Sequence, residues 1–168
     1  MSDADLALVV TAASRTRGRE PDGFRLEIPR FVARRAECIA VTGTSGSGKS
    51  TLLELFGLVL RPDRCDRFEL RVNDDDRFVD VADHWRRGDL NGLARTRARH
   101  IGYVLQTGGL LPYLTAIDNI RLSRALLGLN AGGDYVDRLV DALGIGHVLD
   151  KKPQALSIGE RQRVAVAR

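Results

Sequence analysis

The residues with the clearest chemistry form a short run of glycines and hydroxyl side chains that contains a lysine. The run is Gly43-Thr44-Ser45-Gly46-Ser47-Gly48-Lys49-Ser50-Thr51. Glycines let the backbone turn so that several N–H groups face one point, which favours a bound phosphate. We therefore expect Lys49 to reach the β- and γ-phosphates of a nucleoside triphosphate and the Ser50 hydroxyl to ligate its Mg²⁺. A flexible Gly/Ser turn is the alternative, and the complete spacing argues against it.

The elements around this run are those that a phosphate-binding loop requires. The apolar residues Cys38 to Val41 predict a buried strand before it, with Cys38 as a small core residue. Residues 51–60 predict a helix that ends before Pro62, and its N-terminus would add a partial positive charge to the loop. Further upstream, apolar runs predict strands at residues 6–11 and 24–28, separated by a loop, with Pro29 ending the second strand.

The segment between residues 68 and 100 predicts a strand, a turn and a charged helix. Residues 68–72 alternate apolar and polar side chains, and residues 73–76 (Asn-Asp-Asp-Asp) favour a solvated turn over a metal site. Residues 83–100 predict a mostly exposed helix whose apolar anchors are Trp85, Leu90 and Leu93. A nucleic-acid role for its arginines is the alternative, but Asp89 interrupts them and no aromatic residues are interleaved.

A lone amide and a capped helix start are the next candidates for chemistry. The run Ile101 to Leu105 predicts a buried strand that ends at Gln106, followed by an apolar, proline-containing loop. Residues 116–127, capped by Thr115, and residues 135–143 predict two helices. In the last block, Ser157 and Glu160 have the spacing of a capping box at the start of a helix.

Length and composition limit the class of protein. A chain of 168 residues with 43% hydrophobic and 29% charged residues predicts one domain, residues 1–168, of a soluble globular protein. No apolar run is long enough to cross a membrane, and the acidic N-terminus lacks the pattern of an export signal, so we expect a cytoplasmic location. The two cysteines, Cys38 and Cys65, have no metal-site spacing and are expected to be reduced.

Taken together, the glycine-rich loop, Gln106 and Leu156-Ser157-Ile158-Gly159-Glu160 resemble the nucleotide-binding domain of the ATP-binding cassette (ABC) family. The last block is similar to the family's LSGGQ/E signature. The resemblance implies an α/β P-loop nucleoside triphosphate hydrolase fold with an N-terminal antiparallel β region and a helical subdomain at about residues 107–158. The stretch from Ile101 to Leu127 looks most like lipoprotein-release and macrolide-efflux ATPases.

The resemblance also implies roles for individual residues. Gln106 would help to order Mg²⁺ and the attacking water, so that Lys49 and Gln106 are the catalytic candidates and Ser50 and Gln106 the metal candidates. Ser157, Gly159 and Glu160 would close over the ATP of a second, identical or paired ATPase subunit. The apolar loop Leu110 to Tyr113 would face a transmembrane permease subunit, which places the protein at the inner face of the membrane and makes direct nucleic-acid binding unexpected.

The sequence departs from the family pattern in three respects. Ile158 stands where glycine is usual, and a β-branched residue resists positive φ and close backbone approach. The family's base-stacking aromatic corresponds to Arg17, for which Phe24 could substitute from the next strand. The second acidic strand, catalytic glutamate and switch histidine would follow the signature helix, and this chain ends at Arg168. We therefore expect these 168 residues to bind MgATP but to hydrolyse little of it.

The function expected from these features is that of a transporter ATPase subunit that couples ATP hydrolysis to a separate membrane protein. One alternative is a regulatory module that binds nucleotide without hydrolysing it. Another is a cassette ATPase that acts on DNA or the ribosome, although the tandem cassettes or coiled-coil insertions usual in such proteins are not visible.

Overall fold

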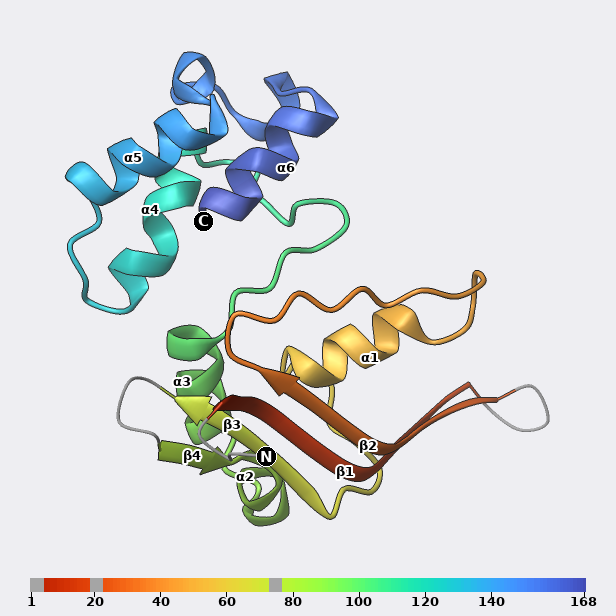
Figure 1. The fold of residues 1–168 in the computed structure, drawn as a ribbon. Coiled ribbons are helices and arrows are strands. Elements are labelled where there is room, and N and C mark those ends of the chain that lie inside the picture. The colour runs from red at the N-terminus through yellow and green to blue at the C-terminus, as the bar shows by residue number, and fades with distance from the viewer. Residues whose placement is uncertain (1–4, 19–22, 73–76) are drawn as a thin grey trace. The chain divides into compact units, whose positions relative to one another are not determined.

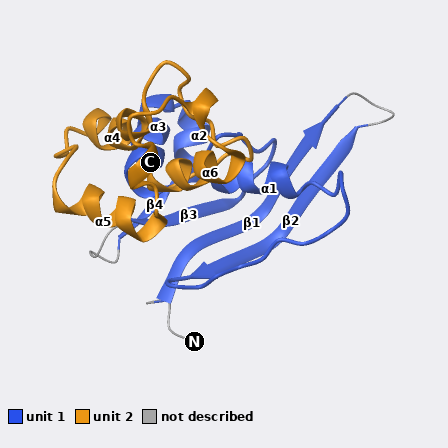
Figure 2. Cartoon of the chain, turned by 90° about the horizontal axis from the view of Figure 1, so that it is seen from above, with its two compact units in different colours: residues 1–101 blue, residues 102–168 orange. Residues whose placement is uncertain are grey.

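The computed structural model describes residues 5–18, 23–72 and 77–168 (Figure 1). The chain divides into two compact units, residues 1–101 and residues 102–168, which are coloured separately in Figure 2. The expected turn at residues 73–76 lies outside the described residues.

The first unit contains an antiparallel four-stranded sheet with the order β2-β1-β3-β4. The strands are β1 (Leu6–Arg17), β2 (Phe24–Arg34), β3 (Arg67–Val72) and β4 (Arg77–Asp80). The N-terminal antiparallel region expected from the sequence is therefore present. β1 extends past residue 11 into the segment expected to be a loop, because its residues 13–17 pair with residues 24–28 of β2.

Pro29 does not end β2, contrary to expectation. β2 is an edge strand, and the missing N–H of a proline is tolerated there because one side of the strand has no ladder to donate to. The neighbouring pairs Ala13–Ile28 and Thr11–Arg30 keep the register on both sides of the proline. Between them Ala12 adopts a φ of 49°, so the irregularity is taken up by β1 and the strand continues to Arg34.

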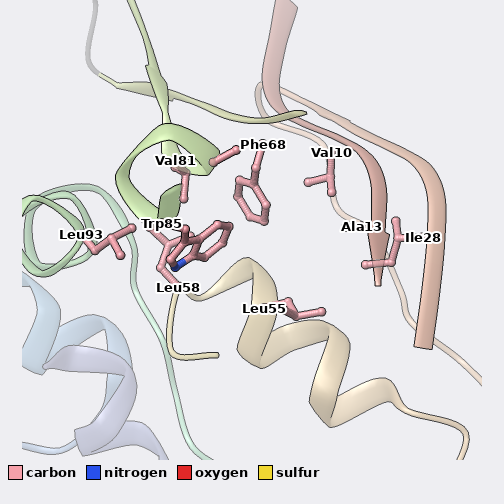
Figure 3. Close-up of a cluster of buried hydrophobic side chains, with 10 residues drawn as sticks. Val10, Ala13, Ile28, Leu55, Leu58, Phe68, Val81, Trp85 and Leu93 are labelled. Carbon is pink, nitrogen blue, oxygen red and sulfur yellow. The ribbon is translucent and has the colours of Figure 1, made fainter. Parts of the chain in front are cut away.

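Three helices and the sheet of this unit share one hydrophobic core. The helices are α1 (Lys49–Phe56), α2 (Val81–Arg87) and α3 (Leu90–His100). Phe68 of β3 is 1% exposed and meets the ring of Trp85 edge-on, with 5.0 Å between ring centroids (Figure 3). The other labelled members, seen in the same close-up, are Val10, Ala13, Ile28, Leu55, Leu58, Val81 and Leu93.

The charged segment at residues 83–100 forms two helices where one was expected. Gly88 takes a left-handed conformation that ends α2, and the Asp89 side chain accepts a hydrogen bond from Gly92 N that begins α3. Trp85 and Leu93 are buried anchors as predicted, whereas Leu90 is 74% exposed. In the same way α1 ends earlier than predicted, at Phe56, because Gly57 caps it and Leu58 has a φ of 54°.

Two predicted strands are absent among the described residues. Residues 38–41 and 101–105 form no strand, and neither segment joins the sheet. Cys38 is exposed, not part of the core as expected, and Val104 and Leu105 are about half exposed. An apolar run becomes a strand only where a neighbouring strand completes its hydrogen bonds, so composition alone was not sufficient here.

The second unit is helical. It contains α4 (Ala116–Leu126), α5 (Asp134–Leu143), two short 3₁₀ helices, η2 (Gly146–Val148) and η3 (Pro153–Ala155), and α6 (Ile158–Ala167). Its core is apolar and includes Ile120 of α4, Val136 of α5, Val148 of η2 and Val164 of α6. None of the helices in the described ranges is both long and apolar enough to span a membrane.

Candidate functional site

The side chain of Lys49 folds back onto the backbone of the glycine-rich loop. Lys49 Nζ donates hydrogen bonds to the carbonyl oxygens of Gly43, at 2.9 Å, and Thr44, at 2.6 Å. Its distance to Ser47 Oγ is 3.5 Å. The ammonium group therefore lies over the loop, at the N-terminal end of α1, where it can act as a point charge toward an anion that the loop holds.

The N-terminus of α1 is not compensated by a side chain. Its N-cap is Gly48, no side chain accepts a hydrogen bond there, and its first turn contains no acidic residue. Each of the other five α-helices in the described residues has a side-chain cap or an acidic residue in its first turn. Because the first four N–H groups of a helix have no partner within the helix, α1 presents free donors and a partial positive charge beside Lys49. This arrangement is suited to binding phosphate.

Glycine is required at two positions of the loop. Gly48 has a φ of 90°, and a Cβ there would lie 2.5 Å from Cζ of Phe24. Gly43 has a φ of 146°, and a Cβ there would lie 2.8 Å from Ser47 Oγ. A side chain at either position would strain the backbone, and at Gly48 it would also press against the Phe24 ring, so both positions favour glycine.

Both residues considered for base stacking lie beside this loop. Arg17 and Phe24 are direct cross-strand partners, at the end of β1 and the start of β2. Arg17 forms an ion pair with Glu54 of α1, which holds its guanidinium against the helix that follows the loop. The ring of Phe24 packs against Gly48 and is 36% exposed. The sequence did not indicate Glu54, because an ion pair between residues 37 positions apart leaves no local pattern.

The hydroxyl residues after Lys49 differ in their environment. Ser50 is exposed, whereas Thr51 is 5% exposed. Among the residues that the structure describes, no cluster of three or more His, Cys, Asp or Glu side chains could hold a metal ion by itself.

The signature block forms the capping box predicted from its spacing. Ser157 is the N-cap of α6, Glu160 N donates to Ser157 Oγ at 3.3 Å, and Glu160 Oε2 accepts from Ser157 N at 2.7 Å. Ile158 begins the helix and is 68% exposed. Gly159 follows in the first turn, so the expected phosphate contacts of Ser157 and Gly159 sit at a helix N-terminus.

One partner of the signature block was not predicted. His147 Nε2 of η2 lies 3.0 Å from Glu160 Oε1. Hydrogen bonds from the Ser157 hydroxyl, the Ser157 backbone and His147 together lower the pKa of Glu160 from 4.5 to about 2. Glu160 is therefore a carboxylate at neutral pH, and His147 belongs to its immediate surroundings.

Gln106 is exposed in a turn, not at the end of a strand as expected. It lines a pocket of about 510 Å³ together with Thr107, Ile158, Arg161 and Gln162. Two residues further on, Gly108 packs so closely on α6 that a Cβ would lie 3.4 Å from the carbonyl oxygen of Arg161. The structure thus brings Gln106 and the start of the signature helix to one pocket of the second unit, while the glycine-rich loop belongs to the first.

A buried amide organises the apolar loop after Gln106. Asn119 of α4 is fully buried, and its Oδ1 accepts from Leu111 N at 2.8 Å. Its Nδ2 donates to the carbonyl oxygens of Leu111, Leu114 and Thr115, at 3.1, 3.3 and 2.9 Å. Tyr113 at the middle of this loop is 68% exposed. The sequence predicted a helix that contains Asn119, but no sequence pattern indicated that the Asn119 side chain would hold the loop after Gln106.

Curated relatives are similar to this chain over most of its length. The lipoprotein-releasing system ATP-binding protein LolD of Saccharophagus degradans is 40% identical over 77% of this chain and 53% of its own length. The macrolide export ATP-binding/permease protein MacB of a Shewanella species is 38% identical over 80% of this chain and 19% of its own. The molybdenum import ATP-binding protein ModC of Methylococcus capsulatus is 38% identical over 87% of this chain and 37% of its own. The chain thus spans about half or less of these relatives' lengths, which include both types predicted from the sequence and an importer.

Solved structures confirm the predicted fold. A dimeric structure of the ATP-binding cassette MJ0796, bound to ADP and Pi, superposes with a TM-score of 0.75 at 24% identity, over 95% of this chain and 67% of that one. The cbiO1 protein of Clostridium perfringens, part of the ABC transporter complex cbiONQ, gives a TM-score of 0.68 at 26% identity, over 97% and 60% of the two chains. A family model described as ABC transporter matches residues 26–168. The chain therefore belongs to the ABC transporter family, within its ATP-binding domain.

Proposed function

We propose that this chain binds MgATP through residues 43–51 and forms the ATP-binding part of the ATP-hydrolysing subunit of a membrane transporter, with little hydrolysis by these 168 residues alone. The observation that carries the proposal is the cradle formed by the loop, in which Lys49 Nζ lies on the carbonyl oxygens of Gly43 and Thr44 at the uncapped N-terminus of α1. A lysine, free helix donors and left-handed glycines in one place form a site for phosphate groups.

The residues present fit MgATP. Lys49 and the N–H groups at the start of α1 would hold the phosphates, and Ser50 and Gln106 would supply oxygen ligands to Mg²⁺. Phe24, which is partly exposed beside Gly48, would contact the base, with Arg17 opposite it on β1. Bound MgATP supplies the phosphoryl group for hydrolysis, while Lys49 and Gln106 would neutralise charge and orient water. We treat the two units as parts of one ATP-binding domain, residues 1–168.

A second copy of the chain, or a paired ATPase subunit, would complete the site. In this proposal Ser157 and Gly159, at the N-terminus of α6, meet the phosphates held by the other copy, and Glu160 fixes Ser157. The exposed Tyr113 and its loop, clamped by Asn119, would face a transmembrane permease subunit at the cytoplasmic side of the membrane. The similarities to LolD and MacB support a transporter partner for this chain, but they do not identify the substrate of that transporter.

The test is to compare MgATP binding by the parent protein, Lys49→Ala and Lys152→Ala, using isothermal titration calorimetry. Lys152 is an exposed lysine of the second unit and is the charge-matched control. Loss of charge-assisted hydrogen bonds predicts affinity about tenfold to a hundredfold weaker in Lys49→Ala and unchanged in Lys152→Ala. Equal affinity in the parent and Lys49→Ala would contradict the site. Phosphate release by the full-length protein tests ATP hydrolysis. Its recovery from membranes together with a permease tests its role as a transporter subunit.

A further inference from the structure

A polar pocket of the second unit lies beside the first turns of α6. It has a volume of about 510 Å³ and is lined by Gln106, Thr107, Ile158, Arg161 and Gln162. The last three are spaced as i, i+3 and i+4, which places their side chains on one face of a helix. One wall of the pocket is therefore this face of α6, and the other is the turn at residues 106–107. The volume is within the range of small-ligand sites.

Close packing of the turn on α6 holds the two walls together. Gly108 is buried with a φ of 79°, and a Cβ there would lie 3.4 Å from the Arg161 carbonyl oxygen and 3.6 Å from the Ala165 Cβ. Gly108 N donates a hydrogen bond to the Leu105 carbonyl oxygen at 2.8 Å, which closes the turn at residues 106–107. The pocket is therefore already formed by the second unit, and no closing movement is needed to assemble it.

Arg161 is the one charged residue that lines this pocket. No carboxylate in the described part of the chain forms an ion pair with it. Its Nη1 donates a long hydrogen bond, 3.4 Å, to the Pro153 carbonyl oxygen. A guanidinium has five N–H donors in a planar fork that matches the oxygens of a phosphate. Because Arg161 is half-buried, donors without a partner carry a desolvation cost that a bound anion would relieve.

The adjacent acidic residue, Glu160, is engaged by other groups. One of its oxygens accepts a hydrogen bond from Ser157 N at 2.7 Å and the other lies 3.0 Å from His147 Nε2, and Glu160 does not line the pocket. The remaining polar lining residues are two amides and a hydroxyl, which can donate hydrogen bonds to oxygen. A positive charge, neutral donors and no lining carboxylate together suit an oxyanion.

We propose that this pocket is a phosphate site, in which Arg161 is the anchor and the amides of Gln106 and Gln162 are further donors. The phosphate is either free inorganic phosphate or part of the nucleotide that a second copy holds against the start of α6, and this second source rests on the proposed function. Loss of charge-assisted hydrogen bonds predicts phosphate binding about tenfold weaker in Arg161→Gln. Arg161→Lys keeps the charge without the planar fork, so its loss should be smaller.

The test follows the side-chain amide NMR signals of Gln106 and Gln162 while inorganic phosphate is added at constant ionic strength, which keeps charge screening equal. Arg138→Gln is the matched control, because Arg138 is an exposed arginine of α5 and does not line the pocket. Lys49→Ala removes the expected phosphate contact of the glycine-rich loop. We expect the parent and these two variants to share one phosphate affinity at both signals, and Arg161→Gln to bind about tenfold more weakly.

Equal phosphate affinity in the parent and Arg161→Gln, or no movement of the two amide signals, overturns the proposal. Sedimentation velocity of the full-length protein with Mg²⁺ and the non-hydrolysable analogue AMP-PNP then separates the two sources. Weaker dimerisation in Arg161→Gln than in Arg138→Gln assigns the phosphate to the nucleotide of a second copy, and equal dimerisation assigns free phosphate. Failure of the parent to bind MgATP would contradict the proposed function but leave phosphate binding by this pocket intact. Thermal unfolding shows whether each variant is folded, and Arg161→Lys replaces Arg161→Gln in the comparison if the latter does not fold.

Discussion

Replacing Gly48 by alanine separates the two reasons for glycine at the start of α1. Gly48 has a φ of 90°, which disfavours any L-residue with a side chain, and its missing Cβ leaves room for the Phe24 ring. A Cβ there would lie 2.5 Å from Phe24 Cζ and 2.7 Å from Cε1. Gly46 is a matched control, because its φ is 81° and nothing lies within 4 Å of where its Cβ would be.

The two effects have different sizes. The left-handed conformation costs a residue with a Cβ about 1–2 kcal/mol. Overpacking typically adds about 1–3 kcal/mol, and we expect about 1 kcal/mol because Phe24 is partly exposed and its ring can shift. Gly48→Ala should therefore reduce the free energy of unfolding by about 2–3 kcal/mol and Gly46→Ala by about 1–2 kcal/mol.

Urea unfolding of a double-mutant cycle tests this assignment. In a Phe24→Ala background the cost of Gly48→Ala should fall by about 1 kcal/mol, because the clash is gone, whereas the cost of Gly46→Ala should not change. Additivity between Gly48→Ala and Phe24→Ala would show that the ring does not lie against the loop. MgATP affinity should fall in Gly48→Ala even where the protein remains folded, since the cradle depends on that backbone conformation.

Two further perturbations address the second unit. Asn119→Ala should destabilise the protein by about 2–4 kcal/mol in guanidinium unfolding, because it removes the acceptor of the Leu111 N–H and the side-chain donor to three carbonyl oxygens, two of which keep a backbone donor. Asn130→Ala, an exposed position, should cost less than about 1 kcal/mol, and an equal loss in both would refute the clamp. Because folding lowers the pKa of Glu160 from 4.5 to about 2, its carboxylate stabilises the fold above about pH 4.5, and this contribution is lost as pH falls toward 2. The stability difference between the parent and Glu160→Gln should therefore shrink over that window in urea unfolding, and a difference independent of pH would contradict the lowered pKa.

The parts of the site that the sequence predicted are those governed by local spacing. The glycine-rich loop, the Thr115 cap and the Ser157–Glu160 capping box each depend on residues within a few positions of one another. Backbone hydrogen bonding at a helix terminus has few solutions, so the same short pattern produces the same geometry. The strands at residues 24–28 and 68–72 were predicted for a similar reason, because they alternate apolar and polar residues, whereas the antiparallel arrangement was expected only from the family resemblance.

What the sequence did not reveal depends on contacts between distant residues. Glu54 pairs with Arg17, His147 with Glu160, and Asn119 with the loop at Leu111, and none of these pairs has a periodic signature. The two strands predicted at residues 38–41 and 101–105 but not formed depend on distant residues in the same way. Their β-branched and apolar composition favours a strand, but the ladder that makes a strand is supplied by another segment.

The structure gives Ile158 a different role from the one expected from the sequence. In the sequence its β-branched side chain was a problem of conformation, since glycine in the family could adopt positive φ. Non-glycine residues with positive φ in the described part of the chain are Ala12, Ala36 and Leu58, so Ile158 begins α6 without that strain. Its side chain is 68% exposed beside Ser157 and lines the pocket that contains Gln106. Ile158 therefore affects which groups can approach the N-terminus of α6, and leaves the conformation of that N-terminus to the capping box.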